Sequence, residues 1–178
     1  MNIEQLKQAL KFGIPFVVLD TETTGLKPGG IIEIAAQKFR GQDVVAEFHF
    51  IVNPECFIEQ GASFTNGLTH KIVQEQGKAV SEIIPAFVNF CGTSTLVGHN
   101  IGFDLKFINH HLRNLNMAEL KNPYVDTLEL AKKYMSLGTS NNKLGTIASH
   151  FGIDISGAHR AMKDVDITRQ VFVKMLNL

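Results

Sequence analysis

Residues 15–52 contain three apolar, strand-like stretches separated only by short turns, and this pattern restricts the fold more than any other feature of the chain. Pro15–Asp20 comes first, Ile31–Phe39 follows the turn at residues 27–30, and Val44–Val52 follows the turn at residues 41–43. Strands joined by such short connections pair with antiparallel neighbours. The first third of the chain therefore predicts an antiparallel meander.

The second half of the chain changes to helical periodicity interrupted by short apolar strands. Helices are expected at Ser81–Phe90, Phe103–Leu115, Thr127–Met135, Lys143–Phe151 and Arg160–Leu176, and strands at Leu96–Gly98 and Tyr124–Val125. The Asn53–Gly67 region is expected to be irregular. Hairpins followed by strand–helix units indicate an α/β fold, a mixed sheet covered by helices. We expect a single domain over residues 1–178, in which residues 1–12 form an amphipathic helical extension.

Composition narrows the class of protein. A chain of 178 residues fits one domain. No apolar run approaches the roughly 20 residues of a membrane span, and the start of the chain does not have the pattern of a signal peptide. The two cysteines, Cys56 and Cys91, are far apart, which favours a reducing cytoplasm. A net charge of zero argues against tight binding to duplex DNA, but leaves room for a nucleic-acid enzyme that relies on metal ions.

Two carboxylates, Asp20 and Glu22, stand at the end of the first predicted strand. Residues two apart in an extended chain point to the same face. Burying unpaired carboxylates costs several kcal/mol, and no Lys or Arg follows before Lys27. The pattern therefore predicts a bound cation near Asp20 and Glu22. Oxygen ligands favour Mg²⁺ or Mn²⁺ over zinc. A solvated strand end is the alternative for this pair by itself.

Three further residues extend this pattern. Asp104 follows an apolar strand and a Gly-containing loop, where the alternative is an acid that stabilises a helix N-terminus. His159 and Asp164 are five residues apart, a turn of roughly 140° on a helix, so they cannot share a helical face. We therefore place His159 in a loop and Asp164 in the following helix. A histidine beside a metal ligand suits a general base, although an ordinary surface loop is the alternative.

Other polar residues receive structural interpretations. Asp126 is predicted to cap the helix that starts at Thr127, with Glu129 reaching back as in a capping box. His110 and His111 are expected on the exposed side of the helix after Asp104. The histidines show no spacing typical of a zinc site.

Taken together, these residues resemble the DEDDh branch of the DnaQ-like 3′→5′ exonucleases, the family of the proofreading epsilon subunit, ribonuclease T and oligoribonuclease. The first motif of that family resembles Phe16–Leu26, the second Leu96–Phe107 and the third His159–Asp164. Weaker matches are Ile31–Ile34, Asn53-Pro54, Gly67–Thr69 and Asp126–Leu128. One departure is Asn66, where many epsilon-like members carry His.

The resemblance implies a ribonuclease H-like fold, a five-stranded mixed sheet flanked by helices. It implies two Mg²⁺ or Mn²⁺ ions held by Asp20, Glu22, Asp104 and Asp164, with His159 as general base. It also implies contacts with the substrate from Thr23, Thr24, Leu26, His99 and Asn100. The expected reaction is hydrolysis of the terminal phosphodiester bond of single-stranded nucleic acid, with DNA favoured, which releases nucleoside 5′-monophosphates.

Three alternatives stay open at this point. Residues 144–164 resemble a helix-turn-helix, which suggests a non-catalytic nucleic-acid-binding module. The same catalytic residues also occur in exoribonucleases, so RNA is an alternative substrate. A proofreading subunit bound to a polymerase, or to another replication or repair protein, is the third alternative. Because the sequence ends at Asn177-Leu178 without an extension, we expect a free-standing enzyme. The sequence does not determine the oligomeric state.

Overall fold

The structure is a computed structural model that describes residues 1–25, 29–134 and 140–177. Within these residues, a mixed sheet of six strands has the order β4-β3-β2-β1-β5-β6. The strands are β1 (Phe16–Thr23), β2 (Ile31–Arg40), β3 (Asp43–Asn53), β4 (Lys78–Ala79), β5 (Thr95–Gly98) and β6 (Tyr124–Asp126). The first three are antiparallel, and β5 and β6 run parallel to β1. The predicted mixed sheet is confirmed, but the count of five strands is wrong because β4 pairs with the end of β3.

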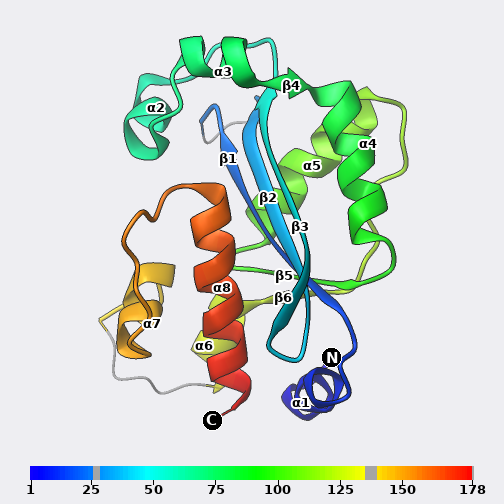
Figure 1. Cartoon of the computed structure of the whole chain (residues 1–178), viewed down its shortest axis with the longest axis vertical. Coiled ribbons are helices and arrows are strands. Elements are labelled where there is room, and N and C mark those ends of the chain that lie inside the picture. The colour runs from blue at the N-terminus through cyan, green and yellow to red at the C-terminus, as the bar shows by residue number, and fades with distance from the viewer. Residues whose placement is uncertain (26–28, 135–139, 178) are drawn as a thin grey trace.

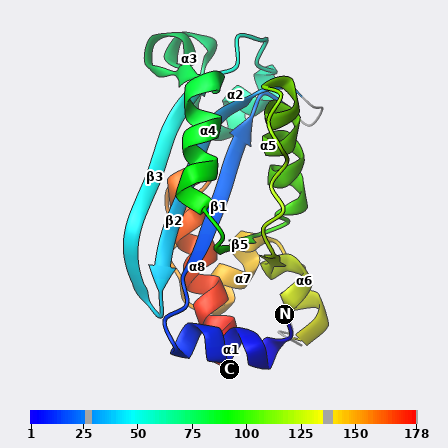
Figure 2. The same ribbon diagram turned by 90° about the vertical axis from the view of Figure 1, so that its right-hand side faces the viewer.

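Helices cover both faces of the sheet (Figures 1 and 2). They are α1 (Ile3–Lys11), α2 (Gln60–Asn66), α3 (His70–Gln76), α4 (Val80–Cys91), α5 (Gly102–Asn114), α6 (Thr127–Tyr134), α7 (Leu144–His150) and α8 (Ala161–Leu176). In Figure 1, α4 and α5 lie on one side of the sheet and α7 and α8 on the other, while α2 and α3 lie across one end. Among the helices that the structure describes, none is long and apolar enough to cross a membrane.

The core has one apolar cluster on each face of the sheet. Phe16 and Phe39 stack with ring centroids 5.6 Å apart, and the ring of Phe172 from α8 packs against both. On the other face, Leu19 packs in a second cluster with side chains of α4 and α5. Phe16 and Val18 thus lie on the face that α8 covers. Because successive side chains of a strand point to opposite faces, the next even-numbered residues of β1 lie on that face as well.

The region between β3 and α4 is more ordered than expected. Asn53–Gly67, predicted to be irregular, contains α2, and α3 follows it. The side chain of Thr69 caps α3 by accepting a hydrogen bond from Ile72 N, and Leu68 and Val73 enter a third small core cluster. Helices of seven residues show too little periodicity to be recognised from sequence.

The helix-turn-helix alternative does not fit the observed packing. Residues 151–160 separate α7 from α8, whereas the motif uses a turn of about three or four residues. One side of α8 is fully buried through Val165, Val171 and Phe172, which belong to the core cluster under the sheet. No residue from Ala161 to Val173 is exposed, so α8 presents no free face of the kind that a recognition helix inserts into a DNA groove. At the other end of the chain, α1 confirms the predicted N-terminal helix and begins with a capping box between Asn2 and Gln5.

Candidate active site

Strand β1 carries Asp20 and Glu22 to the end of the sheet. The strand ends at Thr23, three residues beyond the predicted end at Asp20, so Glu22 lies on it as well. Asp20 stands opposite Ala35 of β2, and Glu22 stands opposite Glu33. Beyond Glu22 the register shifts at a β-bulge, and the chain leaves the sheet. The two carboxylates therefore share the face that α8 covers further down the strand.

Helix α8 completes a cluster of three carboxylates. Asp164 lies in its first turn, and carboxylate oxygens of Asp20, Glu22 and Asp164 all lie within 4.8 Å of one another. No lysine or arginine forms a described ion pair with any of the three, within the part of the chain that the structure covers. Three oxygen donors converging in this way fit a hard divalent cation such as Mg²⁺ or Mn²⁺.

The pKa shifts of the three clustered carboxyl groups also favour a bound cation. Burial, followed by the nearby charges of Asp104 and Asp164, raises the pKa of Asp20 well above its ordinary value. Burial likewise raises the pKa of Glu22 and of Asp164. A bound divalent ion would stabilise the ionised forms of these carboxyl groups, which burial disfavours.

Asp104 approaches the site from the opposite face of β1. It is buried on α5, and its Oδ1 accepts hydrogen bonds from Thr21 N at 2.9 Å and from Thr21 Oγ1 at 2.7 Å. Burial raises the pKa of Asp104 to about 7. Asp104 is not a member of the cluster of three, although its charge acts on Asp20. Of the four acids suggested by the sequence, the structure therefore brings three directly together.

The loop before α8 holds His159, as the five-residue spacing predicted. Its backbone φ is 68°, in the left-handed region, and its N–H donates to Asp164 Oδ2 at 3.0 Å. This hydrogen bond ties the loop to the cluster. His159, Asp20 and Asp164 line the same groove of about 660 Å³, whose other wall is formed by α7.

A second groove, of about 410 Å³, lies on the other side of the cluster. It is lined by Glu22 and Thr23 of β1, residues of α2 and Phe103 of α5. Asn66, where the sequence departs from many epsilon-like proteins, lines this groove, and its Nδ2 donates to Glu22 Oε2 at 3.2 Å. The carboxylates of Asp20 and Asp164 face one groove and that of Glu22 faces the other, so a bound strand can reach the cluster from both sides.

The residues expected to contact substrate are placed as follows. Thr23 Oγ1 donates to Gly25 O, and Thr24 Oγ1 accepts from Gly30 N, so both hydroxyls shape the loop after β1. His99 Nδ1 lies 2.9 Å from Thr127 Oγ1, and burial lowers its pKa. Asn100 donates its backbone N–H to Asp126 Oδ1 at 2.8 Å. Leu26 lies outside the residues that the structure describes.

Two of the structural interpretations need correction. The expectation that His111 is exposed is wrong: it is buried, and its Nε2 accepts a hydrogen bond from Ile31 N at 3.2 Å. Asp126 does cap α6, accepting from Leu128 N, but Glu129 pairs with Lys132 and does not reach back to form a capping box. Both errors concern contacts that helical periodicity does not specify.

Sequence reasoning also missed a buried ionic network beside the cluster. Glu33 has no exposed surface, yet it was noticed only as part of a weak motif. Its carboxylate accepts hydrogen bonds from Arg160 and from the backbone of Ala161 at the start of α8. A charged residue inside the apolar stretch of β2 was the signal that could have revealed it.

Comparison with known proteins agrees with the geometry. The sequence model of the exonuclease family matches residues 17–172. The chain is 34% identical over 163 residues to the DNA polymerase III subunit epsilon of Aquifex aeolicus, covering 90% of this chain and 80% of that protein. It is 34% identical over 179 residues to the PolC-type DNA polymerase III of Thermotoga maritima, covering 99% of this chain but only 13% of that protein.

Solved structures share the fold. Escherichia coli exonuclease I in complex with a dT13 oligonucleotide superposes with a TM-score of 0.80 at 20% identity, over 88% of this chain and 39% of that one. Exonuclease X in complex with 5′ overhanging duplex DNA superposes with a TM-score of 0.74 at 23% identity, over 91% of both chains. The sheet order and its helices thus define a ribonuclease H-like fold.

The chain belongs to the exonuclease family.

Proposed function

We propose that this protein removes nucleotides from the 3′ ends of single-stranded DNA and releases nucleoside 5′-monophosphates. The observation that carries the proposal is the convergence of Asp20, Glu22 and Asp164 within 4.8 Å of one another. His159 lines the groove beside them. We assign catalysis to these four residues together with Asp104.

The donor set fits two divalent ions, Mg²⁺ or Mn²⁺. Asp20, Glu22 and Asp164 would hold them, and Asp104 would support the site from across β1. When bound, such ions supply Lewis acidity and positive charge for phosphodiester hydrolysis. The raised pKa values of the cluster favour this assignment, since a carboxyl group that resists ionisation when metal-free gains most from a cation.

His159 takes the proton of the attacking water. Its loop position next to the groove lets the ring approach the scissile phosphate, while its backbone N–H keeps the loop attached to Asp164. An imidazole can accept a proton and release it again in each turnover, which suits a general base.

The substrate strand enters through the two grooves beside the cluster. The loop at Thr23 and Thr24, with Leu26, receives the terminal nucleotide, while His99 and Asn100 contact the strand from the side of α7. Single-stranded DNA is favoured because an exonuclease of the same fold is described in complex with a dT13 oligonucleotide. Recognition of a chain end needs few phosphate contacts, which is compatible with zero net charge.

We further propose that residues 1–178 act as a single exonuclease unit in the cytoplasm, in which α1 is an extension. Both cysteines are free thiols, as a reducing compartment requires. The epsilon and PolC-type relatives support a polymerase or another replication protein as partner. Size-exclusion chromatography with light scattering, alone and with a polymerase subunit, determines the oligomeric state and tests this association.

The decisive test is digestion of matched 3′-labelled and 5′-labelled DNA and RNA oligonucleotides with Mg²⁺, Mn²⁺ or EDTA. We expect metal-dependent release of mononucleotides from the 3′ end, faster from DNA than from RNA. Asp20→Asn and Asp164→Asn should abolish release, while Asp166→Asn, two residues further along α8, should not. Digestion that continues in EDTA, or full activity of Asp20→Asn, would remove the metal assignment, and faster digestion of RNA would make the protein an exoribonuclease.

A further inference from the structure

Glu33 is a buried carboxylate that has no place in the cluster of three. It lies on β2 directly opposite Glu22 of β1, and none of its surface is exposed. Like charges directly opposite each other on antiparallel strands destabilise the pairing. The charge of Glu33 also acts on Asp20, Glu22 and Asp164, raising the pKa of each after the larger effect of burial. Such a position is electrostatically costly unless Glu33 has strong partners.

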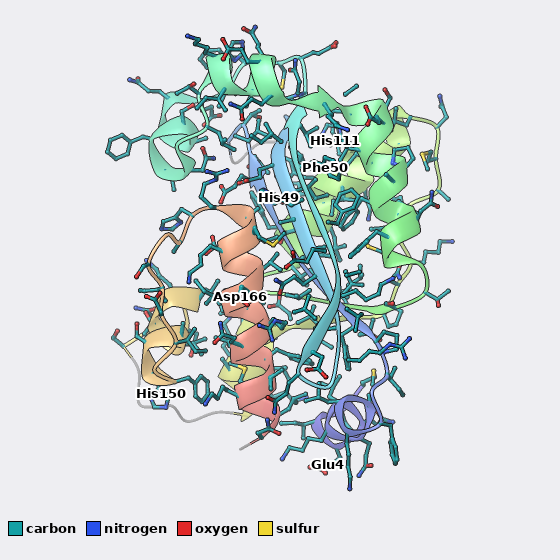
Figure 3. The ribbon with its side chains drawn as sticks, in the orientation of Figure 1. Glu4, His49, Phe50, His111, His150 and Asp166 are labelled. Carbon is teal, nitrogen blue, oxygen red and sulfur yellow. The ribbon has the colours of Figure 1, made fainter. Side chains whose placement is uncertain are left out.

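Its partners are four hydrogen-bond donors, three of them from the start of α8. Arg160 donates Nη2 to Oε1 at 2.8 Å and Nε to Oε2 at 3.1 Å, a bidentate pair. The backbone N–H of Ala161 donates to Oε2 at 3.1 Å, and His49 Nε2 lies 2.8 Å from Oε1. Figure 3 shows His49 on β3, level with the beginning of α8. Burial raises the pKa of Glu33, but the hydrogen bonds of Arg160, His49 and Ala161 outweigh it and leave the pKa below its ordinary value.

Through these contacts Glu33 replaces the missing cap of α8. The residue at the N-cap position is Arg160, whose side chain makes no capping hydrogen bond. The first N–H groups of a helix lack partners within the helix, and a carboxylate there also gains from the helix dipole. Glu33 supplies this carboxylate from β2, an element other than the helix itself. The beginning of α8 is thereby fixed to β2, next to the strand that carries Asp20 and Glu22.

The residues on either side of this anchor are the ones proposed for catalysis. His159 directly precedes Arg160 and has a left-handed backbone, and Asp164 lies one turn after Ala161. We propose that the Glu33–Arg160 pair is a positioning device that sets His159 and Asp164 against β1. Neither member touches the reacting atoms. This inference rests on the proposed nuclease function of the same site.

The chemistry of the pair makes specific demands on both residues. Because every partner of Glu33 is a donor, a glutamine at this position presents its NH₂ group to at least one of them and loses hydrogen bonds. A lysine in place of Arg160 cannot make the bidentate contact, since its ammonium lacks the planar fork. Since the Arg160 side chain is 47% exposed, Arg160→Lys leaves the core packing intact.

The test compares Glu33→Gln, Arg160→Lys, Arg160→Met and the double variant Glu33→Gln/Arg160→Met with wild type in the 3′-labelled DNA assay. Arg169→Lys is the matched control, because Arg169 is also on α8 and pairs with Asp166. We expect kcat to fall by about 10–100-fold in each single variant, the range for partners that orient metal-site ligands, with KM changed less than about twofold. Arg169→Lys should lower the melting temperature by a similar amount but keep kcat.

A purely structural role would lower kcat only in proportion to lost stability, as in the control. The double variant should be no slower than the slower single variant, because residues that act as one unit are non-additive. Wild-type kcat in Arg160→Lys, or additive losses in the double variant, would overturn the inference. If Glu33→Gln does not fold, Arg160→Lys and Arg160→Met still decide the question. Wild-type protein that fails to digest DNA would instead refute the proposed function.

Discussion

Asp20 of β1 and Asp104 of α5 approach the site from opposite faces of β1. The ionised forms of both carboxyl groups are destabilised when no cation is bound. Burial, followed by the charge of Asp104, raises the pKa of Asp20, and burial, with a smaller contribution from the charge of Glu22, raises the pKa of Asp104. The energetic cost of ionisation is evident at a single residue. Asp104 accepts two hydrogen bonds from Thr21, and its pKa is nevertheless about 7. Destabilised ionised groups of this kind are typical of functional sites.

The metal-free protein should therefore become more stable when Asp104 is replaced by Asn. Asparagine retains an oxygen that can accept from Thr21 and removes the charge. Because the pKa of Asp104 rises from 3.8 to about 7 on folding, the native state binds the extra proton between these values, and wild type loses this stability as the pH rises through about 7. In EDTA at pH 8 we expect Asp104→Asn to melt at least about 3 °C higher than wild type.

The same comparison at lower pH provides the control. The difference in melting temperature should shrink as the pH falls from 8 to 6, because wild-type Asp104 then takes up its proton. An advantage that does not vary with pH would show that charge is not its cause. With Mn²⁺ present, wild type should gain stability by binding the ion.

His159→Ala should lower kcat by roughly 10²–10⁴-fold, the range for a positioned acid–base group. The fold should be unaffected, since the side chain lies in an exposed loop. His150→Ala is the matched control, because His150 is exposed at the far end of α7 in Figure 3. Single-turnover digestion of 3′-labelled DNA measures the chemical step. A wild-type rate in His159→Ala would rule out the role of base.

Polar contacts between helices and strands, as well as the apolar core, fix the positions of the secondary-structure elements. α8 is anchored to β2 by Glu33, and α5 is anchored to the start of β2 by His111. The ring of His111 must be neutral to accept from Ile31 N, and burial lowers its pKa to about 4, so the contact persists at neutral pH. Both anchors lie at the end of the central strands where the carboxylates gather.

Replacing His111 with Leu should destabilise the protein by about 1–3 kcal/mol, the cost of leaving a buried donor, here Ile31 N, without an acceptor. Urea unfolding followed by circular dichroism measures the change in free energy. Figure 3 labels His111 on the side of the sheet that α4 and α5 cover. The neighbouring His110→Ala serves as control and should change the free energy of unfolding by less than about 0.5 kcal/mol. Equal effects of the two substitutions would contradict the role of the Ile31 contact.

At the scale of the whole molecule, the charges balance while the acids gather at one end of the sheet. The net charge is zero. A molecule with this balance has little long-range attraction for a polyanion, so binding depends on metal ions and on the chain end.

We therefore expect a weak salt dependence of binding. Between 50 and 200 mM KCl, KM for a single-stranded oligonucleotide should rise by less than about tenfold, against the 10³–10⁵-fold loss typical of proteins with 6–10 phosphate contacts. Steady-state digestion at fixed free Mg²⁺ measures this ratio. A steeper dependence would reveal a basic binding track beyond the two grooves.

Patterns along the sequence were sufficient to predict the strands of the meander, the helices of the second half and the local geometry of each motif. Period-two alternation was enough to put Asp20 and Glu22 on one face, and the spacing of His159 and Asp164 was enough to separate loop from helix. These features depend on residues close together in the chain, where backbone geometry alone fixes direction.

Which distant residues meet became known only from the packing of the elements in three dimensions. Arg160 and Glu33 are 127 positions apart, Ile31 and His111 are 80 apart, and Asn66 and Glu22 are 44 apart. Local periodicity carries no information about such pairs, because the contact depends on how strands pair and on which face each helix covers. For this reason the carboxylates are far apart in the sequence and close together in the fold. The packing of α8 against the sheet brings Asp164 to β1, and Glu33 fixes the start of that helix.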